Sequence, residues 1–183
     1  MRWTIDKQFD FCYGHRVWSQ KLDSEYSIDG SLSCRHLHGH QGVIKIDLST
    51  EQLAGSMVTD FKHLNWFKQW LENTLDHKFI IDKNDPLFAD MFSHYCTDAN
   101  MNKEQFIYHD EGHWTPDLSV VSDEIDAIVE KYEGMVIVDF VPTSENISAW
   151  ILTIVQKKMD KLGVNVSAVQ FWETPKSHCE VRS

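Results

Sequence analysis

Residues 3–12 read Trp3-Thr4-Ile5-Asp6-Lys7-Gln8-Phe9-Asp10-Phe11-Cys12 and set the pattern of the predicted sheet. The apolar side chains at positions 3, 5, 9 and 11 share one parity, which Lys7 interrupts. Because side chains on a strand alternate between its two faces, this pattern predicts a half-buried strand. His15 falls at the end of that strand.

A second stretch, residues 34–40, carries the chemistry and reads Cys34-Arg35-His36-Leu37-His38-Gly39-His40. It leads into a second strand predicted over residues 42–48. In an extended segment the side chains at 34, 36, 38 and 40 point to the same side, so their imidazoles and thiol can converge. Zinc binds imidazole nitrogen readily, and a catalytic zinc often keeps an open position beside three protein ligands. The stretch therefore predicts a catalytic zinc site, completed by His15.

The spacing leaves alternatives open within this site. His36, His38, His40 and His15 exceed the three protein ligands that are needed, so one of them is not a ligand. Cys34 could be a further ligand, which would make the site structural, or it could stand beside the metal as a thiolate base. Without a metal, the same histidines would be ordinary surface or hydrogen-bonding residues.

The remaining pattern predicts an α+β arrangement, with an antiparallel sheet and helices between the second and third strands. Apolar residues at 64, 67, 71 and 75 predict a helix over 63–75. Ser144 is the predicted N-cap of a helix that ends at Gly163. Further predicted elements are a helix over 120–132 and strands over 135–140, 164–173 and 179–182.

Composition restricts the class of protein. The chain has 183 residues, 42% of them hydrophobic and 25% charged, which fits one globular domain. A formal net charge of -11 disfavours nonspecific binding of nucleic acid or anionic membranes. The N-terminus lacks the layout of a signal peptide and no apolar run reaches membrane-spanning length, so we expect a cytoplasmic protein. Its four cysteines lie far apart and are expected to be free thiols.

Ordered motifs spread over most of the chain carry a family resemblance. They are Phe9-Asp10-Phe11 leading to His15-Arg16-Val17, Cys34-x3-His38-Gly39-His40, Val58-Thr59-Asp60-Phe61-x2-Leu64, Leu75-Asp76-His77, Pro142-Thr143-Ser144-Glu145-Asn146 and Glu173-Thr174. This series resembles the family of 6-pyruvoyl tetrahydropterin synthases and 6-carboxytetrahydropterin synthases, which has the tunnelling fold. Residues from about 83 to 138 find no counterpart in the motifs. We therefore expect a single domain over 1–183 with an insertion at about 83–138, which covers a sheet edge, lies at a subunit interface or caps the active site.

The resemblance implies a role for each matched residue. It makes His15, His38 and His40 the zinc ligands, His36 a bystander and Cys34 the catalytic base. It makes Asp76 and His77 the acid/base partner of the cysteine, whereas by itself an Asp-His pair after a helix is a polar helix end. It makes Glu173 the anchor of a pterin ring. Glu145 is expected to combine capping of its helix with a place near the pterin pocket.

The resemblance also implies a reaction. The three residues between Cys34 and His38 resemble the bacterial carboxy-forming branch, which serves the pathway to 7-deazaguanines such as queuosine. That branch converts 7,8-dihydroneopterin triphosphate to 6-carboxy-5,6,7,8-tetrahydropterin, with release of acetaldehyde and triphosphate. The alternatives are the pyruvoyl-forming synthase and a non-catalytic zinc or pterin-binding protein. Homo-oligomers, hexamers in particular, are expected. The candidates for binding the triphosphate, chosen for charge and proximity to the motifs, are Arg16, Lys21, Lys176 and His178.

Overall fold

The computed structural model describes residues 1–96 and 101–183. The strands are β1 Trp3–His15, β2 His38–Thr50, β3 Lys78–Asp82, β4 Phe106–His109, β5 His113–Pro116, β6 Met135–Val138, β7 Asn165–Thr174 and β8 Ser177–Arg182. The α-helices are α1 Asn65–Thr74, α2 Phe88–Met91, α3 Asp126–Glu133 and α4 Ser144–Met159. Short 3-10 helices are η1 Ser33–Arg35, η2 Phe61–Leu64, η3 Lys103–Gln105, η4 Leu118–Val121 and η5 Asp160–Leu162. The strand order, in which neighbours are hydrogen-bonded, is β4-β5-β6-β3-β1-β2-β7-β8.

The chain forms two compact units. The first contains residues 1–12, 40–76 and 143–183, and the second contains residues 13–39 and 77–142. Strands β1 and β2 each run through both units.

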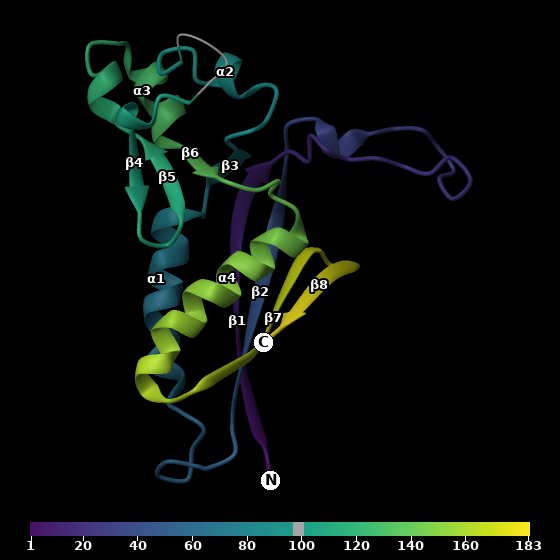
Figure 1. Ribbon diagram of the computed structural model, residues 1–183, viewed down its shortest axis with the longest axis vertical. Helices are drawn as coiled ribbons and strands as arrows, with labels where there is room; N and C mark the ends of the chain where they lie inside the picture. Colours follow the sequence, from purple (N-terminus) through teal and green to yellow (C-terminus); the bar gives the residue numbers. More distant parts are fainter. Residues whose placement is uncertain (97–100) are drawn as a thin grey trace. The chain divides into compact units, whose positions relative to one another are not determined.

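In the first unit, α4 packs along β7 and β8, as Figure 1 shows. The pairs β2/β7 and β7/β8 are antiparallel. The apolar positions predicted for the helix over 63–75 are all buried: Leu64, Phe67, Leu71 and Leu75. Trp70 of α1 meets Trp150 of α4 edge-on, with ring centroids 5.6 Å apart. The core predicted from helical periodicity is therefore confirmed here.

Helix α4 begins one residue away from where its sequence suggests. The N-cap is Thr143, whose side chain accepts a hydrogen bond from the Asn146 amide. Ser144, the cap predicted from the sequence, is the first helical residue. Two adjacent hydroxyl residues are equivalent by type, and the extended backbone of Thr143 decides between them. The α-helix ends at Met159, and η5 continues the helical turns as far as the predicted Gly163, which has a left-handed φ of 66°.

In the second unit the sheet is not antiparallel throughout, as the sequence had suggested. Strand β1 pairs in parallel with β3, with Tyr13 opposite Lys78, and β3 pairs in parallel with β6. The long connections before β3 and β6 permit parallel pairing, which tight hairpins cannot form. The fold remains α+β, now with a mixed sheet.

The segment from about 83 to 138 lies within the second unit and contributes to a core of its own. That core is rich in aromatic residues and comprises Ile81, Phe88, Phe92, Tyr95, Phe106, Val121, Tyr132 and Ile137. The helix predicted over 120–132 is replaced by η4 and α3, and Ile125 between them is 69% exposed. His109 and His113 face each other across the β4/β5 hairpin, with their rings stacked at 4.4 Å. Strands therefore occupy the middle of the chain as well as its ends.

Two glycines in the second unit, each beside a histidine, have neighbours too close for a Cβ atom. A Cβ atom at Gly39 would lie 2.8 Å from the Tyr13 carbonyl oxygen. A Cβ atom at Gly14 would lie 2.5 Å from Phe79 Cδ2. Since real Cβ contacts are longer than this, a side chain at position 39 requires the backbone to move.

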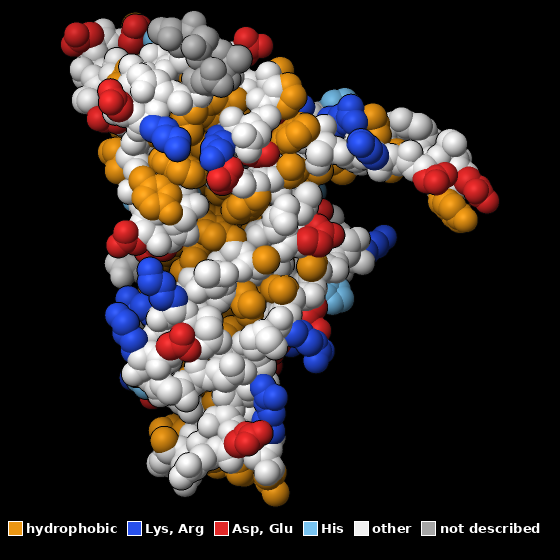
Figure 2. Space-filling model, in the orientation of Figure 1, with side chains coloured by type: hydrophobic (Ala, Val, Ile, Leu, Met, Phe, Trp, Pro, Cys, Tyr) orange, Lys and Arg blue, Asp and Glu red, His pale blue; other side chains and the backbone are white. Residues whose placement is uncertain are grey.

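The surface carries both kinds of charge. On the face that Figure 2 shows, Lys and Arg side chains are interspersed with Asp and Glu side chains. Among the helices of residues 1–96 and 101–183, none combines the length and apolar character that a membrane span needs.

Candidate metal centre

His15 and His38 bring two imidazole rings together, with centroids 4.5 Å apart. A main-chain carbonyl orients each ring. His15 Nδ1 lies 2.6 Å from the Pro142 carbonyl oxygen, and His38 Nδ1 lies 2.8 Å from the His36 carbonyl oxygen. Because a carbonyl oxygen only accepts, Nδ1 must carry the proton in both contacts, which makes Nε2 the nitrogen with the lone pair. This is the arrangement by which outer hydrogen bonds orient metal-binding histidines.

His40 joins this pair from the same strand as His38. The two residues are two positions apart on β2, so their side chains leave the strand on one face. Ring nitrogens of His15, His38 and His40 lie within 4.8 Å of one another. His15 is fully buried, while His38 and His40 are half-buried. Three imidazoles in this arrangement form a donor set that could bind a divalent metal with one position left for substrate.

Cys34 does not belong to the strand that carries these histidines. Residues 33–35 form the 3-10 helix η1, so the predicted common face of positions 34, 36, 38 and 40 applies to His38 and His40 alone. The Cys34 amide donates to Gln20 Oε1 at 3.1 Å, and its carbonyl accepts from the Val17 amide at 2.7 Å. The half-buried thiol is thus placed by the segment that follows His15.

His36 contributes through its backbone. Its side chain is exposed, whereas its carbonyl oxygen orients His38.

The Asp76-His77 pair lies beside a different cysteine, Cys12. Asp76 Oδ1 accepts a hydrogen bond of 2.7 Å from the Cys12 amide. Ligand atoms of Cys12, Asp76 and His77 lie within 4.8 Å of one another. His77 has a φ of 59°, which is uncommon for a residue with a Cβ atom. Sequence reasoning missed Cys12 because the register that sets Tyr13 opposite Lys78 cannot be read from either segment alone.

The two candidate pterin-binding glutamates lie in the first unit. Glu173 Oε1 is 3.8 Å from His40 Nε2, and the Glu173 side chain is 27% exposed. This places a carboxylate next to one histidine of the metal-binding group. Glu145 lies in the first turn of α4, where its carboxylate accepts from the Ser144 hydroxyl. The capping role predicted for Glu145 belongs to Thr143.

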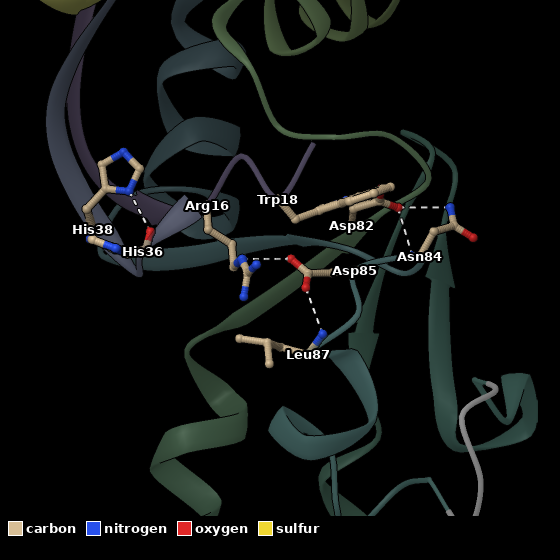
Figure 3. Close-up of polar contacts among 8 residues, drawn as sticks. All are labelled: Arg16, Trp18, His36, His38, Asp82, Asn84, Asp85 and Leu87. Carbon is tan, nitrogen blue, oxygen red and sulfur yellow. Dashed lines mark hydrogen bonds and ion pairs between the residues drawn. The ribbon is translucent and has the colours of Figure 1, made fainter. Parts of the chain in front are cut away.

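A buried ion pair follows His15 directly. Arg16 Nε lies 3.1 Å from Asp85 Oδ2, and the two side chains are 10% and 0% exposed (Figure 3). Burial raises the pKa of Asp85, while the Leu87 amide and the Arg16 charge lower it. The charge of Arg16 is therefore paired with Asp85. This pairing does not support the predicted role of Arg16 in binding triphosphate.

Comparison with known proteins gives a consistent result along the whole chain. The family described as 6-pyruvoyl tetrahydropterin synthase matches residues 4–183. A curated protein of Aquifex aeolicus (strain VF5), named 6-carboxy-5,6,7,8-tetrahydropterin synthase, is 29% identical over 194 residues and covers 100% of this chain and 99% of its own. A protein of Pyrococcus abyssi (strain GE5 / Orsay), named putative 6-carboxy-5,6,7,8-tetrahydropterin synthase, is 26% identical over 170 residues, covering 90% of this chain and 87% of its own.

Solved structures share the fold. Uncharacterized protein WS1659 from Wolinella succinogenes has a TM-score of 0.95 and 47% identity, covering 100% of this chain and 99% of its own. Since that likeness covers the whole chain, the segment from about 83 to 138 is matched there too. The 6-pyruvoyl tetrahydropterin synthase of Caenorhabditis elegans has a TM-score of 0.56 and 18% identity, covering 100% and 96%, which is a likeness of fold.

Proposed function

Because the chain belongs to the 6-pyruvoyl tetrahydropterin synthase family, a family of lyase-type enzymes, we propose that it forms 6-carboxy-5,6,7,8-tetrahydropterin. The proposed substrate is 7,8-dihydroneopterin triphosphate, and the other products are acetaldehyde and triphosphate. The observation that carries the proposal is the convergence of His15, His38 and His40 within 4.8 Å. The carboxy-forming reaction is favoured by the names of the relatives from Aquifex and Pyrococcus.

We propose zinc as the metal because three neutral imidazoles are a donor set that zinc accepts. The ligands would be His15, His38 and His40. His15 and His38 would bind the zinc through Nε2. When bound, zinc supplies a Lewis acid that stabilises the enolate-like charge formed on the substrate side chain. The carbonyls of Pro142 and His36 hold the first two rings in the required tautomer.

The remaining roles are assigned to the other predicted site residues. Cys34 accepts a proton from a side-chain carbon of the substrate, and His77, polarised by Asp76, moves protons elsewhere on that side chain. Glu173 accepts two parallel hydrogen bonds from the ring N-H and 2-amino group of the pterin. Its carboxylate, 3.8 Å from His40 Nε2, would hold the substrate next to the metal ligands. Glu145 would lie near the same pocket.

Product analysis tests the reaction. The purified zinc-loaded protein is incubated with 7,8-dihydroneopterin triphosphate, and its products are identified by mass spectrometry and an acetaldehyde assay. Acetaldehyde together with the 6-carboxy pterin supports the proposal. A product that retains the side-chain carbons would identify the pyruvoyl-forming reaction, and unchanged substrate would point to a non-catalytic zinc or pterin-binding protein.

Two cysteine variants test which thiol acts as the base. We expect Cys34→Ala to keep its zinc and to lose turnover by about 100-fold or more, since general-base catalysis contributes that much. Cys12→Ser, at the thiol beside Asp76 and His77, is the matched comparison. Zinc content is measured by atomic absorption and turnover by product formation. If Cys34→Ala loses its zinc, the thiol is a ligand, and if Cys12→Ser alone loses turnover, the base is Cys12.

The family resemblance also supports statements about assembly and context. We propose a homo-oligomer, hexameric as in the family, in the cytoplasm, with a product that enters 7-deazaguanine synthesis. We propose that the chain acts as one domain in which residues 83–138 are an insertion. Analytical ultracentrifugation of the purified protein tests the assembly, and a monomer at micromolar concentration would contradict it.

A further inference from the structure

Residues 16–20, which we call the strut, join His15 to Cys34 by hydrogen bonds. The strut begins directly after His15, the last residue of β1. The Val17 amide donates to the Cys34 carbonyl at 2.7 Å, and Gln20 Oε1 accepts from the Cys34 amide at 3.1 Å. The Gln20 carbonyl also accepts from Arg35 Nε at 3.0 Å. A displacement of the strut would therefore move His15 and Cys34 together.

The opposite side of the strut is held by the turn of residues 82–85. Arg16 Nε lies 3.1 Å from Asp85 Oδ2, and Trp18 Nε1 donates to Asp82 Oδ2 at 3.0 Å. In Figure 3 the Arg16 side chain points toward the Asp85 carboxylate, and the Trp18 side chain points toward the Asp82 carboxylate.

The turn of residues 82–85 is held by hydrogen bonds among its own residues and to Leu87. Asp82 Oδ1 accepts from both the backbone amide and the side-chain amide of Asn84, each at 2.9 Å. The Asp85 amide donates to the Asp82 carbonyl at 3.0 Å, and Asp85 Oδ1 accepts from the Leu87 amide at 2.8 Å. The Asp85 side chain is fully buried. The two carboxylates that meet the strut therefore also accept hydrogen bonds from their own turn and from Leu87.

Stability alone gives a weak reason for the Arg16–Asp85 pair. A buried ion pair is often no more stabilising than well-packed apolar residues of similar volume, because both charges lose their hydration. A buried ion pair restricts the geometry more than apolar residues do, since each buried charge must lie against its partner. A role in orienting the strut therefore explains the buried Arg16–Asp85 pair better than a role in stabilising the fold.

We propose that the turn of residues 82–85 is the positioning element for both His15 and Cys34, acting through Arg16, Trp18 and the rest of the strut. Asp85 lies at the start of the segment from about 83 to 138, so that segment contributes directly to the geometry of the candidate metal centre. This inference rests on the proposed function in one respect, which is that His15 is a zinc ligand. The effect on Cys34 is independent of zinc.

The test uses the full-length protein and its Asp85→Asn variant. This change removes the charge that Arg16 meets while it keeps the size of the side chain. We expect zinc affinity, measured by competition with a chelator, to fall about tenfold, as for other residues that orient metal ligands. We also expect the alkylation rate of Cys34, followed by peptide mass spectrometry on the zinc-free protein, to change by about threefold or more, because a thiol's reactivity follows its surroundings.

Controls separate positioning from general destabilisation. Glu124→Gln makes the same acid-to-amide change in the same unit, at a side chain 48% exposed near His94, and should leave both measurements unchanged. Asp85→Glu keeps the carboxylate and should recover part of the zinc affinity. Both measurements are made well below the unfolding temperature, so a purely structural role would lower that temperature without changing either one.

Trp18→Phe is the second variant, used also if Asp85→Asn does not fold. It removes the donor to Asp82 and retains an aromatic ring, and we expect the same direction of change in zinc affinity and Cys34 reactivity. Wild-type values of both quantities in the folded variants would overturn the inference. If the wild-type protein itself binds no zinc, the proposed function fails, and the alkylation rate of Cys34 still decides the positioning role.

Discussion

At the scale of single residues, the sequence predicts side chains and cannot predict their backbone partners. The spacing of His38 and His40 is recognisable because a strand places both on one face. The carbonyls of Pro142 and His36, which orient two rings, have no signature since every residue has a carbonyl. The sequence did not predict Cys12 as a site residue for a related reason, since strand pairing brings Asp76 and His77 to it.

Alanine variants of two neighbouring histidines test the ligand assignment. We expect His38→Ala to lower zinc affinity by at least about 100-fold, because it removes one of three ligands. His36→Ala is the matched control, since its exposed side chain can be lost while its carbonyl still orients His38. Zinc content after dialysis, measured by atomic absorption, reports both. Equal zinc loss in the two variants would show that His36 is a ligand.

At the scale of elements, periodicity predicted the segments outside residues 83–138 better than the segment within them. The helix over 63–75 and the last two strands show clear apolar periods, and the structure confirms them. Between 83 and 138 the strand predicted over 135–140 is confirmed as β6, whereas β4 and β5, with four residues each, are too short to show a period. The apolar spacing over 120–132 predicts one continuous helix, whereas α3 begins only after Ile125, which is its exposed N-cap.

The beginning of α4 gives a prediction about stability. We expect Thr143→Ala to lower the free energy of unfolding by about 1 kcal/mol, because the Asn146 amide loses its side-chain acceptor. Ser144→Ala, at the neighbouring position that the sequence favoured, should cost less, since alanine is the better helix former there. Urea denaturation followed by circular dichroism compares the two. A larger loss for Ser144→Ala would place the cap where the sequence suggested.

At the scale of the whole molecule, the α+β class was predictable, and the parallel strand pairs were not. Strands at both ends with helices between them fit an antiparallel sheet, which the pairs β2/β7 and β7/β8 do form. The pairs β1/β3 and β3/β6 are parallel, and such pairs join segments far apart in the chain. Neither the local pattern nor the turn residues record which distant strand becomes the neighbour.

The stability of the protein in acid should depend on His113. Burial, followed by the charge of His109, lowers the pKa of His113 from 6.5 to about 4. The folded state therefore binds this proton less readily than the unfolded state. The free energy of unfolding therefore has its full value, as far as His113 is concerned, above pH 6.5. It decreases by up to about 3 kcal/mol as the pH falls toward 4.

Urea denaturation at several pH values measures this loss. His113→Gln should flatten the decline in stability over that pH range, whereas His178→Gln, at an exposed position, should leave it unchanged. An equal decline in the wild type and His113→Gln would assign the acid sensitivity to other groups.

Gly39 stands between His38 and His40, and a Cβ atom there would lie 2.8 Å from the Tyr13 carbonyl oxygen. Every single replacement at this position must therefore move one strand edge, and the two histidines beside it would move as well. Natural variants that keep His15, His38 and His40 as metal ligands should therefore keep glycine at position 39. For directed evolution, a library over this strand should hold position 39 constant and place its diversity at exposed Gln41.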